Sequence, residues 1–169
     1  MIISLIILII SFVLEIILNN FLPYSINDLS LFTPMFSIVS LSLIYQFLKK
    51  DKIKYLFISI ILGIIYDFVF TNLLFFNAIL FFMIALVVIS FNKYLDVNCI
   101  NLILEIILII FLYEIMSSII IILFNLVPMS FYRLFYKISH SLLINIIYGE
   151  IVLLIIRLVP GKYKKLSIN

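Results

Sequence analysis

Long apolar runs, broken only by short polar clusters, constrain this chain more than any other feature. The run from Met1 to Leu22 contains one charged residue, Glu15, and the run from Tyr55 to Asn92 contains only Asp67. A helix needs about 20 mostly apolar residues to cross a bilayer. Only 11% of the residues are charged, whereas soluble domains carry roughly 25%. The sequence therefore predicts an all-α integral membrane protein.

Polar and proline-containing breaks divide the chain into about six predicted transmembrane helices, which form one compact domain over residues 1–169. All four prolines lie at the predicted boundaries. Thr33 is expected to cap the second helix, with Pro34 as its first residue. The helices are expected at about 1–22, 31–48, 55–70, 74–91, 100–127 and 139–159.

Lysine and arginine predict the orientation of the bundle. With six spans and a cytoplasmic N-terminus, nine of the eleven basic residues fall on the cytoplasmic side, and only Arg133 and Lys137 fall outside. Cytoplasmic loops are enriched in these residues. We therefore expect a multi-pass protein with both termini in the cytoplasm. The first run lacks the basic start of a secretory signal and is expected to be retained.

Five carboxyl groups fall inside the predicted spans, where lipid offers them no solvation. Glu114 and Glu150 are expected nearest the membrane midplane, Glu15 and Asp67 nearer the outer ends of their helices, and Glu105 within reach of the cytoplasmic interface. These groups either fix helix packing or contact the helix of a partner protein, or they form a proton relay or cation site. The first interpretation is favoured, because no basic partner is expected at their depth.

The spacing of Ser59 and Gly63 on the third predicted helix lets another helix approach closely. This pair belongs to a wider set of candidate helix-packing or partner-binding residues. The set comprises Pro34, Ser59, Gly63, Asp67, Glu114 and Glu150.

The sequence carries no motif typical of catalysis. A glycine-rich phosphate loop, a zinc-binding HExxH segment and a nucleophile elbow are all absent. The single cysteine, Cys99, and the single histidine, His140, cannot by themselves form a cysteine- or histidine-rich metal site. The net charge of +3 is small and its basic residues are scattered over loops. We therefore expect no enzymatic activity, no cofactor, no metal and no nucleic-acid partner.

Three features between Thr33 and Phe91 resemble the MreD family of rod shape-determining proteins. A proline opens the second predicted helix, the third ends in Gly63-Ile-Ile-Tyr-Asp67, similar to the family's Gly-x-x-x-Asp, and a short turn over 71–78 leads into an apolar helix. The family often has glycine in this turn where Phe75 or its neighbour stands. The local backbone is therefore expected to differ at that point.

The resemblance implies a bundle similar to the substrate-binding subunits of energy-coupling-factor vitamin transporters, and a non-catalytic role. MreD proteins act in the bacterial cell-elongation machinery, which synthesises peptidoglycan, with the bitopic protein MreC, the actin-like MreB, a SEDS-type glycosyltransferase and a class B penicillin-binding protein. Pro34, Gly63 and Asp67 are the residues of this sequence that match the family's pattern. Gly63 would permit close helix contact, and Asp67 would cap a helix or bind a polar partner near the outer leaflet.

The expected function is therefore a scaffold in the bacterial cytoplasmic membrane that binds MreC directly and MreB and the wall synthases indirectly. The alternative is a substrate-binding subunit of a vitamin transporter, which could have the same fold. Such a subunit needs an outward pocket with convergent polar groups. The short, apolar outer loops and the lack of tryptophan count against it.

Overall fold

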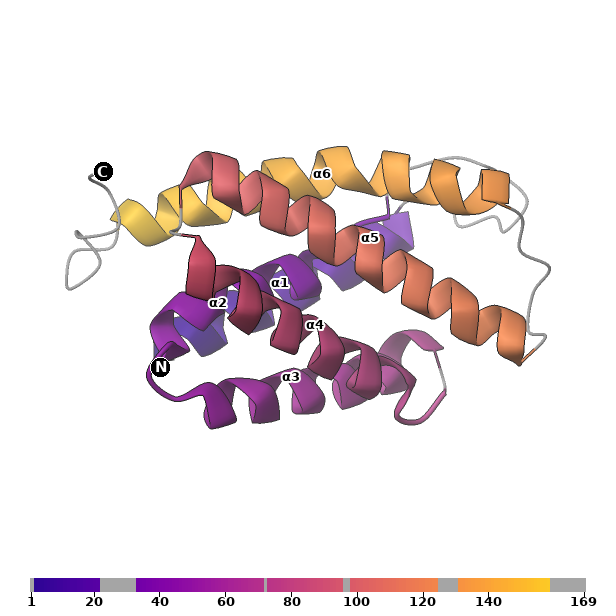
Figure 1. The fold of residues 1–169 in the computed structure, drawn as a ribbon, viewed down its shortest axis with the longest axis horizontal. Helices are drawn as coiled ribbons and strands as arrows, with labels where there is room; N and C mark the ends of the chain where they lie inside the picture. Colours follow the sequence, from indigo (N-terminus) through magenta and orange to yellow (C-terminus); the bar gives the residue numbers. More distant parts are fainter. Residues whose placement is uncertain (1, 22–32, 72, 96–97, 125–130, 159–169) are drawn as a thin grey trace.

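Six α-helices and one short π-helix make up almost all of the part of the chain that the computed structural model describes, residues 2–21, 33–71, 73–95, 98–124 and 131–158. This confirms the predicted all-α class. The elements, shown in Figure 1, are α1 (Ile2–Phe21), α2 (Phe36–Leu48), α3 (Lys52–Tyr66), the π-helix η1 (Asp67–Thr71), α4 (Phe76–Tyr94), α5 (Cys99–Leu123) and α6 (Phe131–Leu158).

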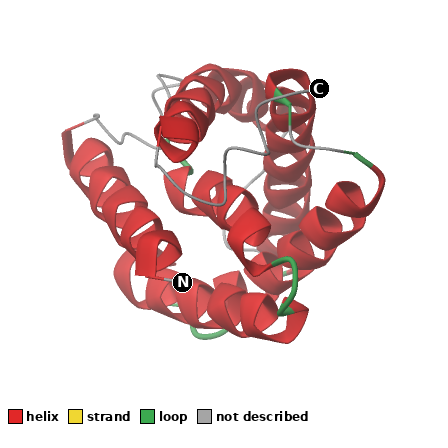
Figure 2. Cartoon of the chain, turned by 90° about the vertical axis from the view of Figure 1, so that its left-hand side faces the viewer, coloured by secondary structure: helices red, strands yellow, loops and turns green. Residues whose placement is uncertain are grey.

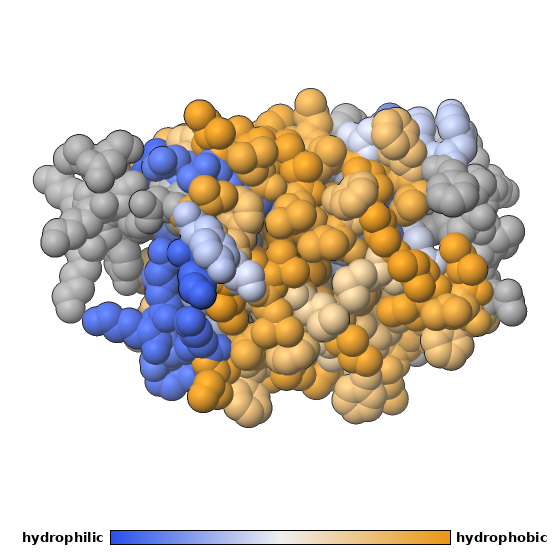
Figure 3. Space-filling view, viewed as in Figure 1, coloured by the Kyte–Doolittle hydropathy of each residue, from blue (hydrophilic) through white to orange (hydrophobic). Residues whose placement is uncertain are grey.

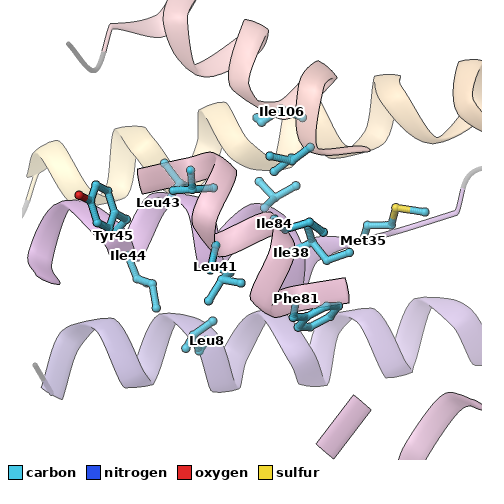
Figure 4. Packing of buried hydrophobic residues seen from close by; sticks show 14 of the residues in the cluster. Leu8, Met35, Ile38, Leu41, Leu43, Ile44, Tyr45, Phe81, Ile84 and Ile106 are labelled. Atoms are coloured by element: carbon cyan, nitrogen blue, oxygen red, sulfur yellow. The ribbon is translucent and has the colours of Figure 1, made fainter. Parts of the chain in front are cut away.

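The short helix α2 lies at the centre of the bundle. It contacts all five other α-helices, and the end-on view of Figure 2 shows helices arranged around a central one. Every residue from Phe36 to Tyr45 is buried. The helix contains no charged residue, and a helix without a charged face is typical of such an enclosed position. The main core cluster therefore forms where α2 meets its neighbours, as Figure 4 shows for Ile38, Leu41, Phe81, Ile84 and Ile106.

The outer surface is apolar over most of its length. Five of the described helices, all except α2, are long and apolar enough to cross a membrane. Figure 3 shows an apolar surface whose hydrophilic residues gather at the end where α2 turns into α3. That end carries the exposed segment Lys49–Lys54. The chain is therefore a membrane protein with a basic cluster at one end of its apolar surface.

The helix α2 is shorter than the span predicted for it. It contains 13 residues, or about 20 Å at 1.5 Å per residue, against about 30 Å of hydrocarbon. The predicted cap is also wrong. Met35, not Thr33, is the N-cap, and the buried Thr33 hydroxyl has no hydrogen-bond partner among the described residues. Pro34 lies before the helix instead of in its first turn.

The helix α6 begins earlier than the sequence predicts, at Phe131 instead of about residue 139. The predicted bounds place Arg133 and Lys137 between the fifth and sixth helices, but both belong to the first turns of α6. The reason is that arginine and lysine are good helix formers, so charge alone does not end a helix near a membrane surface. Smaller differences occur at α3, which begins at Lys52, and at α5, which ends at Leu123.

Candidate functional site

The carboxyl group of Asp67 joins the end of α3 to the beginning of α4. It accepts hydrogen bonds from the backbone N–H of Asn77 (2.8 Å), the Asn77 side-chain amide (2.9 Å), the Thr71 hydroxyl (2.9 Å) and the backbone N–H of Ala78 (3.4 Å). The first N–H groups of a helix have no partner within the helix. Asp67 therefore caps α4 from the neighbouring helix, and Tyr113 on α5 extends the cluster with a hydrogen bond to the Asn77 oxygen (2.8 Å).

Gly63 allows this arrangement because it lies directly against the first turn of α4. A Cβ atom at this position would lie 2.5 Å from the Cα of Ala78 and 2.6 Å from the carbonyl oxygen of Asn77. Ser59, one turn earlier, is buried, and its hydroxyl donates to the Leu56 carbonyl of its own helix (2.7 Å). The Ser59–Gly63 spacing therefore lies at an internal contact between α3 and α4.

The N-cap residue of α4, Phe75, has a left-handed backbone conformation with φ 67° and ψ 0°. It is the only non-glycine residue in the described part of the chain with positive φ. This conformation costs an L-residue roughly 1–2 kcal/mol, and glycine adopts it freely. Phenylalanine therefore occupies a position whose backbone conformation favours glycine.

Phe75→Gly is expected to leave stability unchanged or to raise it by up to about 1 kcal/mol, because the relief of strain exceeds or offsets the added freedom of the unfolded chain. Phe75→Val is expected to lower stability by about 1 kcal/mol, since a β-branched residue is strained at positive φ. Thermal unfolding of the detergent-purified variants measures both effects. A glycine variant that unfolds at a lower temperature than the valine variant would contradict this explanation.

The backbone N–H groups at the beginning of α2 also donate hydrogen bonds to side chains of two other helices, α1 and α6. The carboxyl group of Glu15 on α1 accepts hydrogen bonds from the backbone N–H (2.8 Å) and hydroxyl (2.6 Å) of Ser37, and from the Tyr66 hydroxyl (2.7 Å). Asn145 on α6 accepts a hydrogen bond from the Met35 N–H (2.8 Å). These contacts explain how α2 can begin inside the bundle, where unpaired backbone groups would be costly.

Hydroxyl groups also join α1, α2 and α6 near the middle of the bundle. Ser11, Ser40 and Tyr148 hydrogen-bond to one another, with 2.5 Å between the oxygens of Ser11 and Tyr148. The Tyr148 ring stacks on Phe36 with 4.0 Å between ring centroids. The Ser11 hydroxyl on α1 is therefore paired inside the protein with groups of α2 and α6.

Glu105, which is expected within reach of the cytoplasmic interface, is almost fully shielded from the surface. Glu105 is buried between helices, and its carboxyl group accepts hydrogen bonds from Ser42 on α2 (2.8 Å) and Asn92 on α4 (3.0 Å). Two donors on neighbouring helices lie close enough to satisfy the carboxyl group in place of water. Glu105 therefore joins α2, α4 and α5.

The expected absence of a basic partner for Glu114 is also wrong. The ammonium group of Lys137 lies 2.8 Å from the carboxyl group of the fully buried Glu114. The sequence interpretation missed this pair because it placed Lys137 outside the sixth helix. Neither carboxyl oxygen has an aligned hydrogen-bond partner among the described residues, so the pair is held by charge. It joins α5 to the first part of α6.

Glu150 differs from the other four carboxyl residues in its position. It is half-buried, and one of its oxygens is buried without a hydrogen-bond partner in the described part of the chain. On α6 it shares a face with Leu143, Ile147 and Leu154, which are exposed. An ionisable group at the edge of a lipid-facing surface is costly unless a partner satisfies it.

The buried polar groups therefore serve mainly to join helices. Asp67 and Glu15 cap helix starts, Glu105 and Glu114 pair with side chains of neighbouring helices, and Glu150 alone borders the outer surface. The described residues contain no cluster of three or more His, Cys, Asp or Glu side chains that could bind a metal ion. Asn77, which contacts Asp67 and Tyr113, is absent from the candidate residues named from the sequence, because its role depends on the turn before α4.

Comparison with known proteins identifies the family. The model of the family described as rod shape-determining protein MreD matches residues 1–160. No curated protein and no solved structure matches the chain, so the predicted similarity to vitamin transporter subunits stays a prediction. The family match covers nearly the whole chain and agrees with the resemblance found around Gly63 and Asp67. The chain belongs to the MreD family, with a role in rod shape determination.

Proposed function

We propose that this protein is a non-catalytic membrane scaffold of the bacterial cell-elongation machinery. It binds the membrane-spanning helix of MreC and helps to link MreB to the SEDS-type glycosyltransferase and penicillin-binding protein that build the wall. The family supports the role in rod shape. The use of Glu15, Asp67 and Glu105 as contacts between helices supports a structural function for the protein interior.

The observation that carries the binding proposal is Glu150 at the edge of an apolar face of α6. Leu143, Ile147 and Leu154 on the same face are more than half exposed, at 59%, 52% and 54%. A purely lipid-facing surface has no use for a carboxyl group, because lipid offers no hydrogen-bond donor. A polar side chain on a partner helix would supply that donor, while the three apolar residues pack against the same helix.

Glu150→Leu is therefore expected to reduce the amount of MreC that copurifies in mild detergent by roughly three- to thirtyfold. This range corresponds to the loss of one hydrogen bond between helices in a membrane. The bundle itself should be as stable as the wild-type protein or slightly more stable, because an unsatisfied polar oxygen is removed. The measurement is affinity purification with co-expressed MreC, followed by mass spectrometry of the bound proteins and small molecules.

Glu150→Gln is the matched control, because its amide still offers hydrogen-bonding groups and should retain MreC. Glu105→Leu tests a carboxyl group that is buried away from the α6 face and should retain MreC in the fraction that folds. If the Glu150→Leu protein retains MreC as well as the wild type does, α6 is not the binding face.

The orientation proposed for the scaffold places both termini in the cytoplasm. The helix α1 begins, and α6 ends, at the same end of the bundle as the basic cluster Lys49–Lys54 (Figures 1 and 3). Because cytoplasmic loops are rich in lysine and arginine, this end is proposed to face the cytoplasm. The opposite end, with the turn between α3 and α4, would then face the side of wall synthesis.

The alternative, a vitamin-binding transporter subunit, is not favoured by the groove between α1 and α3. Its lining side chains are all leucine, isoleucine or phenylalanine, whereas small-molecule sites also place a few polar groups around the ligand. The same purification distinguishes the two functions. A bound vitamin-like molecule without a protein partner would overturn the scaffold proposal.

A further inference from the structure

An apolar groove of about 230 Å³ lies on the surface between α1 and α3. It is lined by residues from Leu5 to Phe12 on α1 and from Ile58 to Ile65 on α3. The backbones of these two helices do not approach each other closely along the described residues, so their side chains leave this space between them. Each of these segments contains eight residues, and the seven steps between them correspond to about 10 Å at 1.5 Å per residue.

The size and lining of the groove favour an occupant narrower than a membrane-spanning helix. A length of about 10 Å is only a third of the roughly 30 Å that such a helix crosses. Close helix contacts in membranes also use glycine, alanine or serine, and the groove is lined only by large side chains such as Ile9, Phe12 and Ile61. A narrow, flexible apolar chain fits these limits, which describes part of a lipid acyl chain.

The basic end of the groove indicates the headgroup of that lipid. Lys54 precedes Ile58 by one helical turn and so lies on the same face of α3 as the groove. Its exposed ammonium group is 3.1 Å from Asp51. The exposed segment 49–54 contains four lysines and one aspartate, a net charge of +3. Such a cluster at the membrane surface attracts anionic lipids.

We propose that this groove binds one acyl chain of an anionic phospholipid whose headgroup lies against Lys54 and the neighbouring lysines. Both helices begin at the basic end of the bundle (Figures 1 and 3). A lipid in the adjoining leaflet would therefore enter with its headgroup already beside the cluster. The site is separate from the α6 face proposed for MreC, so either proposal can fail without the other.

The test is photo-crosslinking of the full chain in phosphatidylcholine vesicles that contain a small amount of phosphatidylglycerol with a diazirine on its acyl chain. Mass spectrometry then locates the labelled peptides. Labels are expected to concentrate on the groove-lining parts of α1 and α3. Lys54→Gln should reduce this labelling about fivefold, because one lysine near an anionic membrane surface contributes about 1 kcal/mol of binding free energy. Lys93→Gln, which removes an exposed lysine at the end of α4, should not.

Two further variants test the groove itself. Ile61→Phe places a larger side chain in the groove at a half-exposed position, and Ile119→Phe makes the same change at a similarly exposed position on α5. Only the first is expected to reduce groove labelling. Even labelling of all lipid-facing helices would overturn the proposal, as would equal labelling by a phosphatidylcholine probe. A crosslink between two copies of the chain through the groove would also overturn it.

Discussion

Gly63→Ala is expected to lower the stability of the folded bundle by about 3 kcal/mol, the upper end of the usual cost of overpacking. The added Cβ would lie 2.5 Å from the Ala78 Cα and 2.7 Å from the Ala78 nitrogen. These are backbone atoms at the start of α4, so they cannot rotate away as a side chain can. The helices α3 and α4 must therefore separate, which also lengthens the hydrogen bonds between Asp67 and Asn77.

Gly149→Ala provides the matched control for this prediction. A Cβ there would meet the Cδ1 of Ile106, the far end of a flexible side chain, and the Cγ1 of Val39 at 3.2 Å. Because these atoms can move, its cost should be about 1 kcal/mol. Heating the purified proteins and measuring the fraction that stays monodisperse compares the two. If Gly149→Ala destabilises more than Gly63→Ala, the backbone contact is not the limiting one.

The structural class of this protein could be predicted from the sequence because it depends on the hydropathy and charge of long stretches and not on single residues. Apolar runs of about 20 residues with isolated charges are sufficient to indicate a helical membrane bundle. Three local features between Thr33 and Phe91, including the motif that ends in Asp67, indicated the family resemblance, which the family match over residues 1–160 confirms. Neither prediction required knowledge of which helices touch.

The sequence could not predict features that depend on a partner from another helix. The start of α2 at Phe36, later than predicted and inside the bundle, requires Glu15 on α1 and Asn145 on α6 to satisfy its backbone. The burial of Glu114 requires Lys137, which a hydropathy pattern assigns to a loop. In each case the polar residue can be recognised in the sequence, but its partner lies far away in the chain.

Asp67→Leu is expected to lower stability by about 3–5 kcal/mol, because it removes a helix cap and leaves several buried donors without an acceptor. Four donor groups, from Thr71, Asn77 and Ala78, contact the Asp67 carboxyl group. Lipid cannot replace the lost acceptor. Asp67→Asn keeps one oxygen acceptor and should lose roughly half as much. Thermal unfolding in detergent measures the series.

Glu105→Leu separates a capping role from a general cost of removing a buried carboxyl group. Glu105 accepts hydrogen bonds from two side chains, Ser42 and Asn92, but it caps no helix. Its replacement should therefore cost about 2 kcal/mol, less than that of Asp67. The folded fraction of either variant should still retain MreC, because neither carboxyl group reaches the outer surface. An Asp67→Leu protein that unfolds at the wild-type temperature but loses MreC would instead place Asp67 at the partner interface.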